Sequence, residues 1–266
     1  METMMILGLI SAVLMGMTLG VFGAGGSILT VPILVFLMGV SASEATAYSL
    51  FIVGVTAVFG AYTYYKQDLI QFKIGFVFAI PAFIGVYSVR LFLMPALPEH
   101  IASIGSYDLS KDALVLIVFS LIMIMAAYAM IKPSKVESTE QNKTLNFPLI
   151  AVEGLVVGGV TGFVGAGGGF LIIPALVILA GLSMKQAVGT SLMIIAFKSL
   201  LGFVGDIQAG LMIDWTLLLQ VVGLSIVGVF IGERIARKVD GNKLKPAFGY
   251  FVLVMGIGIL IREILI

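Results

Sequence analysis

Residues 20–35 read Gly-Val-Phe-Gly-Ala-Gly-Gly-Ser-Ile-Leu-Thr-Val-Pro-Ile-Leu-Val, and residues 162–177 read Gly-Phe-Val-Gly-Ala-Gly-Gly-Gly-Phe-Leu-Ile-Ile-Pro-Ala-Leu-Val. Nine of the sixteen positions are identical at one fixed offset of 142, without a gap. In each copy a cluster of glycines lies between two strongly apolar runs, and a proline follows six residues after the last shared glycine. Glycine loosens a helix and proline interrupts it, so each copy is expected to contain a helix that breaks and restarts. The chain is interpreted as two copies of one unit.

The composition places the chain in a lipid bilayer. Of its 266 residues, 60% are hydrophobic and only 11% are charged, and the mean hydropathy is +1.17. No soluble core of this size can hide so much apolar surface. The sequence therefore predicts a polytopic membrane protein. Its first apolar run is expected to be retained, because the N-terminus lacks a basic region and a small-residue cleavage site.

Several classes of function are excluded by what the sequence lacks. It contains no cysteine, which removes disulfides, thiol catalysis and thiolate metal sites, and its single histidine, His100, argues against a metal cluster. The net charge is +1 and no block of Lys and Arg is present, so no nucleic-acid surface is expected. We expect neither a metal nor a cofactor.

The apolar runs divide evenly between the two copies. They cover residues 5–22, 27–40, 43–65, 72–94 and 112–131, and then 146–163, 169–181, 184–204, 214–236 and 246–265. The longest polar run, 132–145, is read as a linker between a first membrane repeat, 1–131, and a second, 146–266. A second polar interval, 95–111, is expected on the membrane surface. The fold class is an all-α polytopic membrane protein with two five-segment repeats and about eight to ten transmembrane segments.

The odd number of segments per copy makes the second copy enter the membrane from the opposite face, so the repeats are expected to be inverted. Alternating segments put eleven of the fifteen cations on one face, which the positive-inside rule assigns to the cytoplasm. Both chain termini are then outside. If each glycine cluster instead lies at the surface, the cations divide eight to six, which is too small a bias to fix an orientation.

The second segment of each copy is short for a membrane span. Residues 27–40, about 14 residues, reach only about 21 Å, against a hydrocarbon core of about 30 Å. The chain is therefore expected to turn inside the bilayer at each glycine cluster. The two turns enter from opposite faces and are expected to meet near the midplane. Inverted repeats whose broken helices converge at mid-membrane are typical of secondary transporters.

Helices that restart after Gly26 and Gly168 would direct free N–H groups and the positive ends of two dipoles at one point, which makes an anion site. The competing interpretation is close helix packing by small residues, and isolated glycines such as Gly154, Gly158 and Gly223 are read that way. Three glycines within four residues, followed by proline, favour the site at the two clusters. Its expected members are Gly23, Ala24, Gly25, Gly26, Ser27, Gly165, Ala166, Gly167, Gly168 and Gly169.

Polar residues follow each cluster in register, because residues 41–50 align with residues 183–192 at the same offset. Ser43 or Ser183 is expected to cap the third helix of its copy. The deeper hydroxyls, about two helical turns inside, are those of Ser49, Thr190 and Ser191. Each of them can donate to an anion or bond back to a carbonyl of the preceding turn, and both interpretations stay open.

Lys198 lies about 14 residues, or about 21 Å, from the inner face, where the first copy has Thr56. An unpaired ammonium at that depth is costly. It is read as a counter-charge for the substrate, as a structural pair with Glu153 or Asp206, or as a side chain that snorkels outward. Glu153 is otherwise a candidate proton carrier if transport is coupled.

The arginines and aromatic residues near segment ends are interpreted as contacts with the membrane interface. Arg90 and Arg234 occupy comparable ends of the fourth segments and are read as interfacial anchors rather than as ligands. Trp215 is read in the same way.

The duplicated Gly-x-Gly-Gly…Pro signature, with Gly-Thr-Ser-Leu at 189–192 and Gly210 followed by Asp214-Trp215, resembles the sulfite exporter TauE/SafE family of membrane transporters. The resemblance covers essentially the whole chain. It implies movement of a small sulfur-containing anion such as sulfite, sulfoacetate or a related sulfonate, usually outward, across a bacterial or archaeal plasma membrane. By position it implies a site at residues 23–27, 165–169, 190 and 191. The first copy departs from the second by having Ser27 where the second has Gly169.

The resulting hypothesis is an alternating-access carrier in the lipid bilayer for a small oxyanion, with a coupling proton or cation as a further partner. The two glycine turns would bind the anion through N–H groups, and Lys198 would add charge. A passive anion channel would use the same dipoles along a continuous wet path, and a structural membrane subunit would leave the glycine turns without a role. An intramembrane enzyme needs a nucleophile beside a base, and no histidine or pair of carboxylates lies at membrane depth, so no enzymatic activity is expected.

Overall fold

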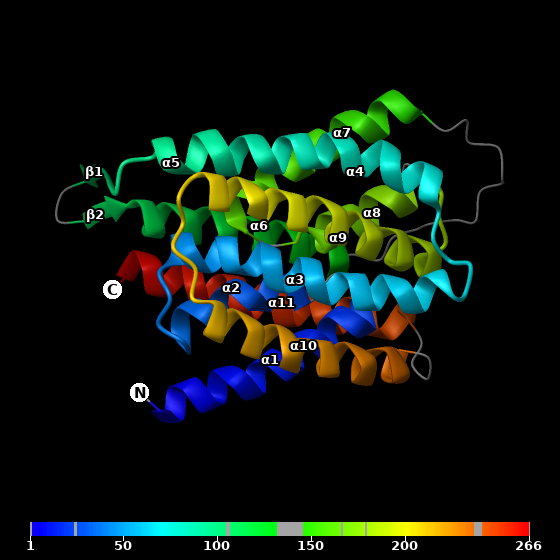
Figure 1. The fold of residues 1–266 in the computed structure, drawn as a ribbon, viewed down its shortest axis with the longest axis horizontal. Helices are drawn as coiled ribbons and strands as arrows, with labels where there is room; N and C mark the ends of the chain where they lie inside the picture. Colours follow the sequence, from blue (N-terminus) through cyan, green and yellow to red (C-terminus); the bar gives the residue numbers. More distant parts are fainter. Residues whose placement is uncertain are drawn as a thin grey trace.

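The computed structural model describes residues 2–23, 26–104, 107–131, 146–165, 167–178, 180–236 and 241–265. The predicted linker, 132–145, lies outside the described residues. Within them the chain is a bundle of helices that lie side by side, with a short β-hairpin at one end (Figure 1).

Each copy of the repeat forms one long helix, one short helix and three more long helices. In the first copy these are α1 (Glu2–Phe22), α2 (Gly26–Phe36), α3 (Ala42–Tyr65), α4 (Phe72–Ser88) and α6 (Lys111–Ile131). In the second copy they are α7 (Phe147–Val164), α8 (Gly169–Ile178), α9 (Met184–Gln208), α10 (Trp215–Ala236) and α11 (Gly241–Leu265). Helix α4 continues through a π-helical turn, η1 (Val89–Leu93), into the short α5 (Met94–Ala96).

Six of the described helices are long and apolar enough to cross a membrane, which makes the chain an integral membrane protein. They are α3, α4 with its continuation to Ala96, α6, α7, α9 and α10. Helix α1 adds a shorter apolar stretch, Ile6–Phe22. Helices α2 and α8, with 11 and 10 residues, reach only about half of a hydrocarbon core of about 30 Å.

The expectation of an all-α chain is wrong between α5 and α6. There, β1 (His100–Ile104) and β2 (Tyr107–Ser110) pair in antiparallel fashion. Pro98 precedes the hairpin and has no N–H group with which to continue a helix, so the backbone finds its partners across two strands instead. The hairpin lies at the end of the bundle where α1 begins and α11 ends (Figure 1).

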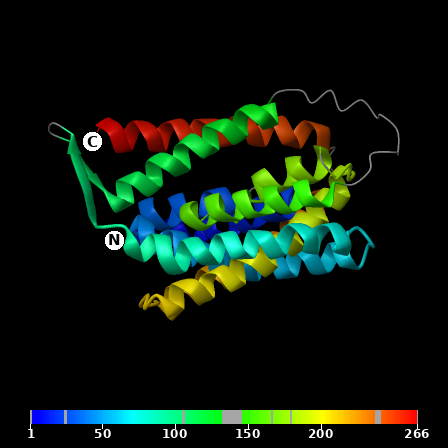
Figure 2. The same cartoon turned by 90° about the horizontal axis from the view of Figure 1, so that it is seen from above.

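The long helices pair across the two copies in a reciprocal pattern. Helix α1 packs against α10, and α4 packs against α7, so the first helix of each copy meets the fourth helix of the other. Helix α6 packs against its counterpart α11, and the two lie side by side at one edge of the bundle (Figure 2). Helix α3 packs against its counterpart α9. The described helices are thus arranged by exchange between the copies rather than as two separate bundles.

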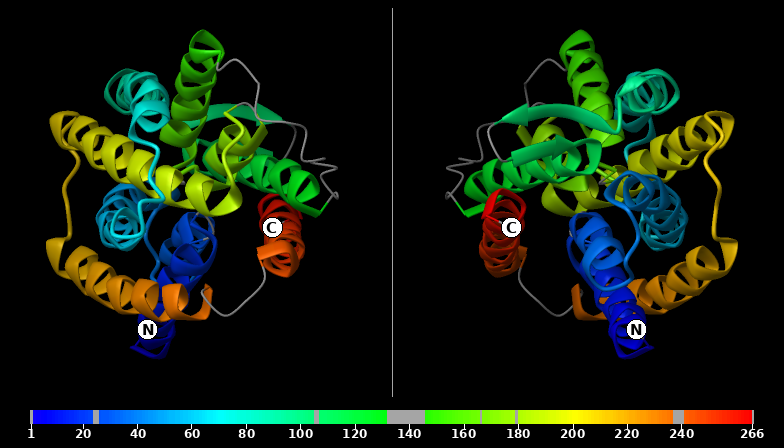
Figure 3. Two further views of the ribbon diagram at one scale, coloured as in Figure 1. Left: turned by 90° about the vertical axis from the view of Figure 1, so that its right-hand side faces the viewer. Right: turned by 90° about the vertical axis from the view of Figure 1, so that its left-hand side faces the viewer.

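Helices α3 and α9 form the centre of the bundle, with the other pairs around them (Figure 3). Of their most apolar stretches, 72% and 67% of the residues are buried, against 33–44% in the other four candidate spans. The two helices run in opposite directions (Figure 1). They cross where a Cβ added to Gly54 would lie 3.2 Å from the backbone nitrogen of Leu200, two residues from Thr56 and from Lys198.

Glycines let the outer pairs approach backbone to backbone. A Cβ added to Gly228 of α10 would lie 2.1 Å from the carbonyl oxygen of Val13, and one added to Gly158 of α7 would lie 2.1 Å from that of Ala82. Gly154 meets the backbone of α4 in the same way, so the packing role predicted for Gly154 and Gly158 is confirmed. The same interpretation is wrong for Gly223, which is exposed and has nothing within 4 Å of its Cβ position.

The third helix of each copy is capped by a serine, as predicted, but not always by the serine named. Ser183 caps α9 in a capping box with Gln186. In α3 the cap is Ser41, which accepts a hydrogen bond from the Glu44 amide, and not Ser43. The offset of 142 relates Ser41 to Ser183. The repeat alignment therefore identifies Ser41 as the cap, whereas its distance from the apolar run did not.

We predict that Gly228→Ala destabilises the protein and that Gly223→Ala, in the same helix, does not. The methyl group at 228 must displace the backbone of α1, and overpacking of this kind costs about 1–3 kcal/mol or more. At 223 the methyl group enters open space. Unfolding midpoints of the two detergent-purified variants, followed by circular dichroism, test this. Equal midpoints would contradict a backbone-to-backbone contact between α1 and α10.

Candidate functional site

Lys198 lies in the middle of α9 and has no exposed surface. Its Nζ donates a hydrogen bond to Thr161 Oγ1 on α7, at 2.8 Å. A Cβ added to Gly168 would lie 3.5 Å from the same Nζ, so the ammonium reaches the residue directly before α8. Complete burial shows that the interpretation as an outward-snorkelling side chain is wrong.

No carboxylate among the described residues forms an ion pair with Lys198. The predicted structural pair with Glu153 or Asp206 is therefore wrong, because Asp206 pairs with Arg90 instead. Glu153 lies half-buried on α7, and its Oε2 makes no hydrogen bond within the described part of the chain. The ammonium is left with one neutral hydroxyl as its hydrogen-bond partner there.

Sequence reasoning did not single out Thr161, the partner of Lys198. Its hydroxyl donates to the carbonyl oxygen of Gly158 at 3.2 Å and accepts from the lysine, so both of its roles are used. The offset of 142 relates Thr161 to Leu19, and this change from an apolar to a polar residue inside an apolar run is the signal that marks it.

The second glycine cluster forms the turn between α7 and α8. Gly165 caps α7 with a φ of +73°, and its amide donates to the carbonyl oxygen of Thr161 at 2.9 Å. Gly168 has a φ of +72° and accepts the first hydrogen bonds of α8, from the amides of Leu171 and Ile172. Gly167 and Gly169 are buried beside it, and Ala166 lies outside the described residues. The positive end of α8 and the Lys198 ammonium therefore lie next to each other.

The first glycine cluster lies against the other central helix. Gly23 has a φ of +66°, and its added Cβ would lie 2.4 Å from Val188 on α9. Gly26 begins α2 and packs on the backbone of α1 at Met15. Ala24 and Gly25, like the side chain of Ser27, lie outside what the structure describes. The counterpart of Lys198 in this copy, Thr56, donates its hydroxyl to the carbonyl oxygen of Ile52.

The two turns do not meet at one point. Gly165 packs on Thr46 of α3, and Gly23 packs on Val188 of α9. Thr46 and Val188 each lie ten residues, or about 15 Å, from the crossing at Thr56 and Lys198. Because α3 and α9 run in opposite directions, Thr46 and Val188 lie on opposite sides of the crossing, toward opposite ends of the bundle. The expectation that the turns converge near the midplane is therefore wrong, and the second turn alone lies beside the buried ammonium.

The predicted hydroxyls have mostly structural partners. Thr190 Oγ1 accepts from the amide of Gln71 at 3.0 Å, at the start of α4. Ser191 Oγ bonds back to the carbonyl oxygen of Val188 at 2.8 Å and also lies 3.4 Å from that of Gly23. Ser49 Oγ is buried and makes no hydrogen bond among the described residues. For Ser191 the interpretation as a bond within its own helix is the one that the geometry supports.

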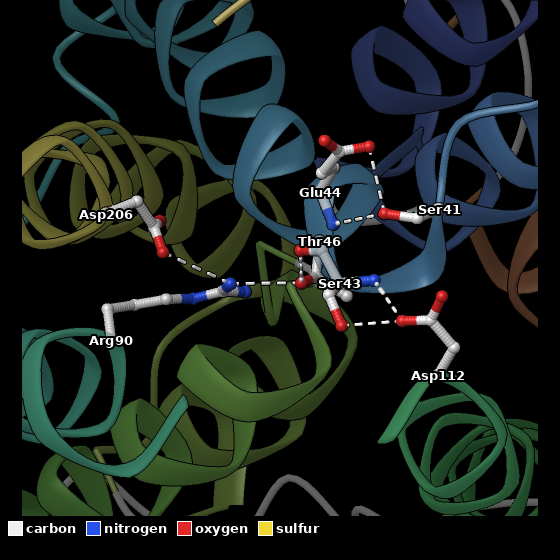
Figure 4. A network of polar contacts seen from close by, with 7 residues as sticks. All are labelled: Ser41, Ser43, Glu44, Thr46, Arg90, Asp112 and Asp206. Carbon is white, nitrogen blue, oxygen red and sulfur yellow. Dashed lines mark hydrogen bonds and ion pairs between the residues drawn. The ribbon is translucent and has the colours of Figure 1, made fainter. Parts of the chain in front are cut away.

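Arg90 is a buried, hydrogen-bonded residue that sequence reasoning misread. It lies in the π-helical turn η1, is 1% exposed, and donates from Nη1 to Thr46 Oγ1 at 3.0 Å and to Asp206 Oδ1 at 3.4 Å (Figure 4). Its interpretation as an interfacial anchor is wrong. π-Helical turns are rare and occur often at functional sites, and here the turn lies where the arginine enters the bundle. Arg234, by contrast, is exposed.

A cavity of about 350 Å³ opens beside Arg90, and we call it the vestibule. It lies between the start of α3, the end of α4, the start of α6 and the end of α9. Its charged lining residues are Glu44, Arg90, Glu99, Lys111, Asp112 and Asp206. Asp112 accepts from the amide and the hydroxyl of Ser43 (Figure 4), while Glu99 lies 3.7 Å from Lys111. A cavity of this volume suits a small molecule.

A continuous set of contacts runs from the vestibule to the buried ammonium. Arg90 bonds to Thr46, Thr46 packs on Gly165, and Gly165 begins the turn that ends at Gly168 beside Lys198. All of these residues are buried. Among the described residues, no group of three His, Asp or Glu side chains is placed to hold a metal ion. Arg90 and Lys198 are the groups along this path that can make direct contact with an anion.

Comparison with known proteins gives consistent results over the whole chain. The family model described as "Sulfite exporter TauE/SafE" matches residues 8–259. A probable membrane transporter protein of Xylella fastidiosa (strain 9a5c) is 26% identical over 256 residues, covering 94% of this chain and 92% of that protein. The probable membrane transporter proteins YdhB and YjnA of Bacillus subtilis (strain 168) are 27% and 28% identical, covering 88% and 93% of this chain and 91% and 98% of their own lengths. No solved structure shows a significant match.

We predict that Gly165→Ala destabilises the protein far more than Gly181→Ala. Both positions have positive φ, +73° and +64°, so both variants carry a backbone strain of about 1–2 kcal/mol. Only at 165 does the new Cβ also meet another backbone, 2.3 Å from Thr46 Cα, which adds about 1–3 kcal/mol of overpacking. Unfolding midpoints of the two variants measure the difference. Midpoints lowered by the same amount would show that the turn is not held against α3.

Proposed function

Because the chain belongs to the sulfite exporter TauE/SafE family of membrane transporters, we propose that it is a secondary transporter of a small sulfur-containing oxyanion such as sulfite or an organosulfonate, and that it works as an exporter. The membrane is proposed to be the plasma membrane of a bacterium or archaeon. The proposed role of the site is to bind and release an anion rather than to catalyse a reaction.

The observation that carries this proposal is the buried Lys198 ammonium beside the N-terminus of α8. Both are positive, both are removed from water, and no carboxylate among the described residues pairs with the lysine. A buried cation without a counter-ion is costly, and an anion held between the ammonium and the first amides of α8 would offset that cost. A single lysine and one helix N-terminus provide few contacts to the anion. Binding would therefore be weak enough to let the anion leave, as transport requires.

We propose that the two copies form inverted repeats with helices broken at the glycine turns, and that the carrier works by alternating access. The exchange of partners, α1 with α10 and α4 with α7, supports a two-fold relation between the copies. The opposite directions of α3 and α9 support inversion. Rocking of one copy against the other about the α3–α9 crossing would expose the buried ammonium to each face in turn.

We propose that both chain termini are outside, as the distribution of cations predicts. Helix α1 begins and α11 ends at the same end of the bundle, which fits termini on one face (Figure 1). The vestibule opens at the end where α3 begins and α9 ends, which is that same end. In this orientation the vestibule faces outward, which is the side where an exporter releases its substrate. Glu153 stays our candidate for a coupling proton, with its Oε2 unbonded within the described residues.

We predict that Lys198→Met lowers sulfite flux in proteoliposomes about tenfold or more at subsaturating sulfite, because a charged hydrogen-bond donor to the anion is lost. The matched control is Lys185→Met, which makes the same change at an exposed position in the first turn of the same helix and is expected to transport normally.

The concentration dependence of the flux tests the mechanism separately. A carrier saturates, because each transport cycle binds and releases one anion. Unchanged sulfite flux in Lys198→Met would show that the Lys198 ammonium does not bind the transported anion. Flux that rises linearly with sulfite, without saturation, would favour the passive channel and overturn the carrier.

A further inference from the structure

The guanidinium of Arg90 has hydrogen-bond donors without a partner. A guanidinium carries five N–H groups, and here Nη1 serves both Thr46 and Asp206. Nε and Nη2 are buried and make no hydrogen bond within the described part of the chain. Buried donors that make no hydrogen bond are costly, so these positions are expected to be occupied in some state of the protein.

The unpartnered donors belong to a residue that lines the vestibule. Figure 4 shows the guanidinium between Asp206 and Thr46, with Asp112 farther away, beyond Ser43 at the start of α3. The planar, forked arrangement of the N–H groups of an arginine matches two oxygens of one oxyanion, which a lysine cannot do. The structure thus offers a second, chemically different place for an anion, nearer to the open end than Lys198.

We propose that the floor of the vestibule is an anion subsite distinct from Lys198, in which Arg90 binds a small oxyanion through Nε and Nη2 while Asp206 gives up its bond to the same guanidinium. The class of ligand rests on the proposed function, since it is the transported oxyanion. Asp206 is the internal competitor. Its Oδ2 already makes no hydrogen bond among the described residues, so the carboxylate is held to Arg90 by Oδ1 alone, at 3.4 Å.

The other carboxylates of the vestibule have partners of their own. Glu44 accepts from Ser41 Oγ at 2.9 Å, Asp112 accepts from Ser43, and Glu99 lies beside Lys111. Together with Asp206 they make four carboxylates against two cations, so the vestibule as a whole does not attract anions. Binding must therefore come from the direct contact with Arg90. The surrounding negative charge keeps that binding weak, which suits a site that an anion passes through.

The absence of cysteine from the sequence makes a direct test simple. Ala209→Cys places one thiol in the exposed lining of the vestibule, and Gln67→Cys places one in the exposed turn between α3 and α4, outside it. Each protein is labelled in detergent with a membrane-impermeant cationic thiosulfonate, in the presence of increasing ethanesulfonate and at constant ionic strength set with chloride. Ethanesulfonate is used because sulfite itself cleaves the mixed disulfide.

We expect ethanesulfonate to slow the labelling of Ala209→Cys and not that of Gln67→Cys. Adding Arg90→Gln abolishes the protection, and adding Lys198→Met leaves it intact. The double change Arg90→Gln with Asp206→Asn, which removes both charges of the pair and leaves no buried carboxylate alone, also shows no protection. Protection that survives Arg90→Gln, protection that is lost in Lys198→Met, or no protection at all would each overturn the subsite.

The exchange with Asp206 has its own matched control. Asp206→Asn removes the competitor and is expected to lower the half-protecting concentration of ethanesulfonate about tenfold, because the charge of the guanidinium is then no longer shared with a carboxylate, an effect of the size of one charged hydrogen bond. Glu44→Gln removes one vestibule carboxylate that does not touch Arg90 and is expected to change it far less. If both variants shift the half-protecting concentration equally, the overall negative charge of the vestibule sets the affinity for ethanesulfonate. That result would contradict competition between Asp206 and the anion for Arg90.

The outcomes also separate this inference from the proposed function. If protection depends on Arg90 but proteoliposomes of the unaltered protein show no sulfite flux, the proposed transport function is wrong and the anion subsite is supported. If sulfite flux is saturable and needs Lys198 but ethanesulfonate does not protect the Ala209→Cys thiol, the transport function is supported and the anion subsite is wrong.

Discussion

The burial of two cations, Arg90 and Lys198, in an interior built from apolar helices is the constraint on which the rest of this structure depends. A charge removed from water must be compensated nearby, and the protein does so differently in the two places. Arg90 has a carboxylate and a hydroxyl, and Lys198 has only a hydroxyl among its described partners. Lys198 is therefore left with less compensation for its charge than Arg90 among the described residues.

Close backbone contact is what allows so polar an interior within so apolar a chain. The glycine of each turn lies directly on the central helix of the other copy, Gly165 on Thr46 and Gly23 on Val188, and residues 46 and 188 are themselves related by the repeat offset. The central helices cover both turns, Gly165 by the backbone of Thr46 and Gly23 mainly by the side chain of Val188, as irregular backbone in a bilayer requires. The same two helices also hold the polar residues of the site. Thr46 on α3 accepts a hydrogen bond from Arg90, and Lys198 on α9 lies beside Gly168 of the second turn.

The sequence was sufficient for features that repeat or that depend on composition. The class of protein, the short second helix of each copy and the Ser183 cap follow from periodicity, apolarity and the offset of 142, while the family was indicated by the resemblance of the motifs. It was not sufficient for Arg90, whose partners lie 44 and 116 residues away, or for Thr161, which lies 37 residues from Lys198. No spacing rule along one helix connects such residues. The level of the two turns was also misjudged, because segment length limits how far a helix reaches but does not specify which neighbour it meets.

Residues 56 and 198 hold the same place in the two copies, beside the crossing of the central helices. An ancestor made of two identical subunits would have had to put the same residue at both places, and two ammonium groups facing each other there would repel strongly in a medium of low dielectric constant. Duplication followed by fusion into one chain removes that restriction, because each half can then diverge alone. This chain has threonine in one half and lysine in the other, an unequal pair that two identical subunits could not provide.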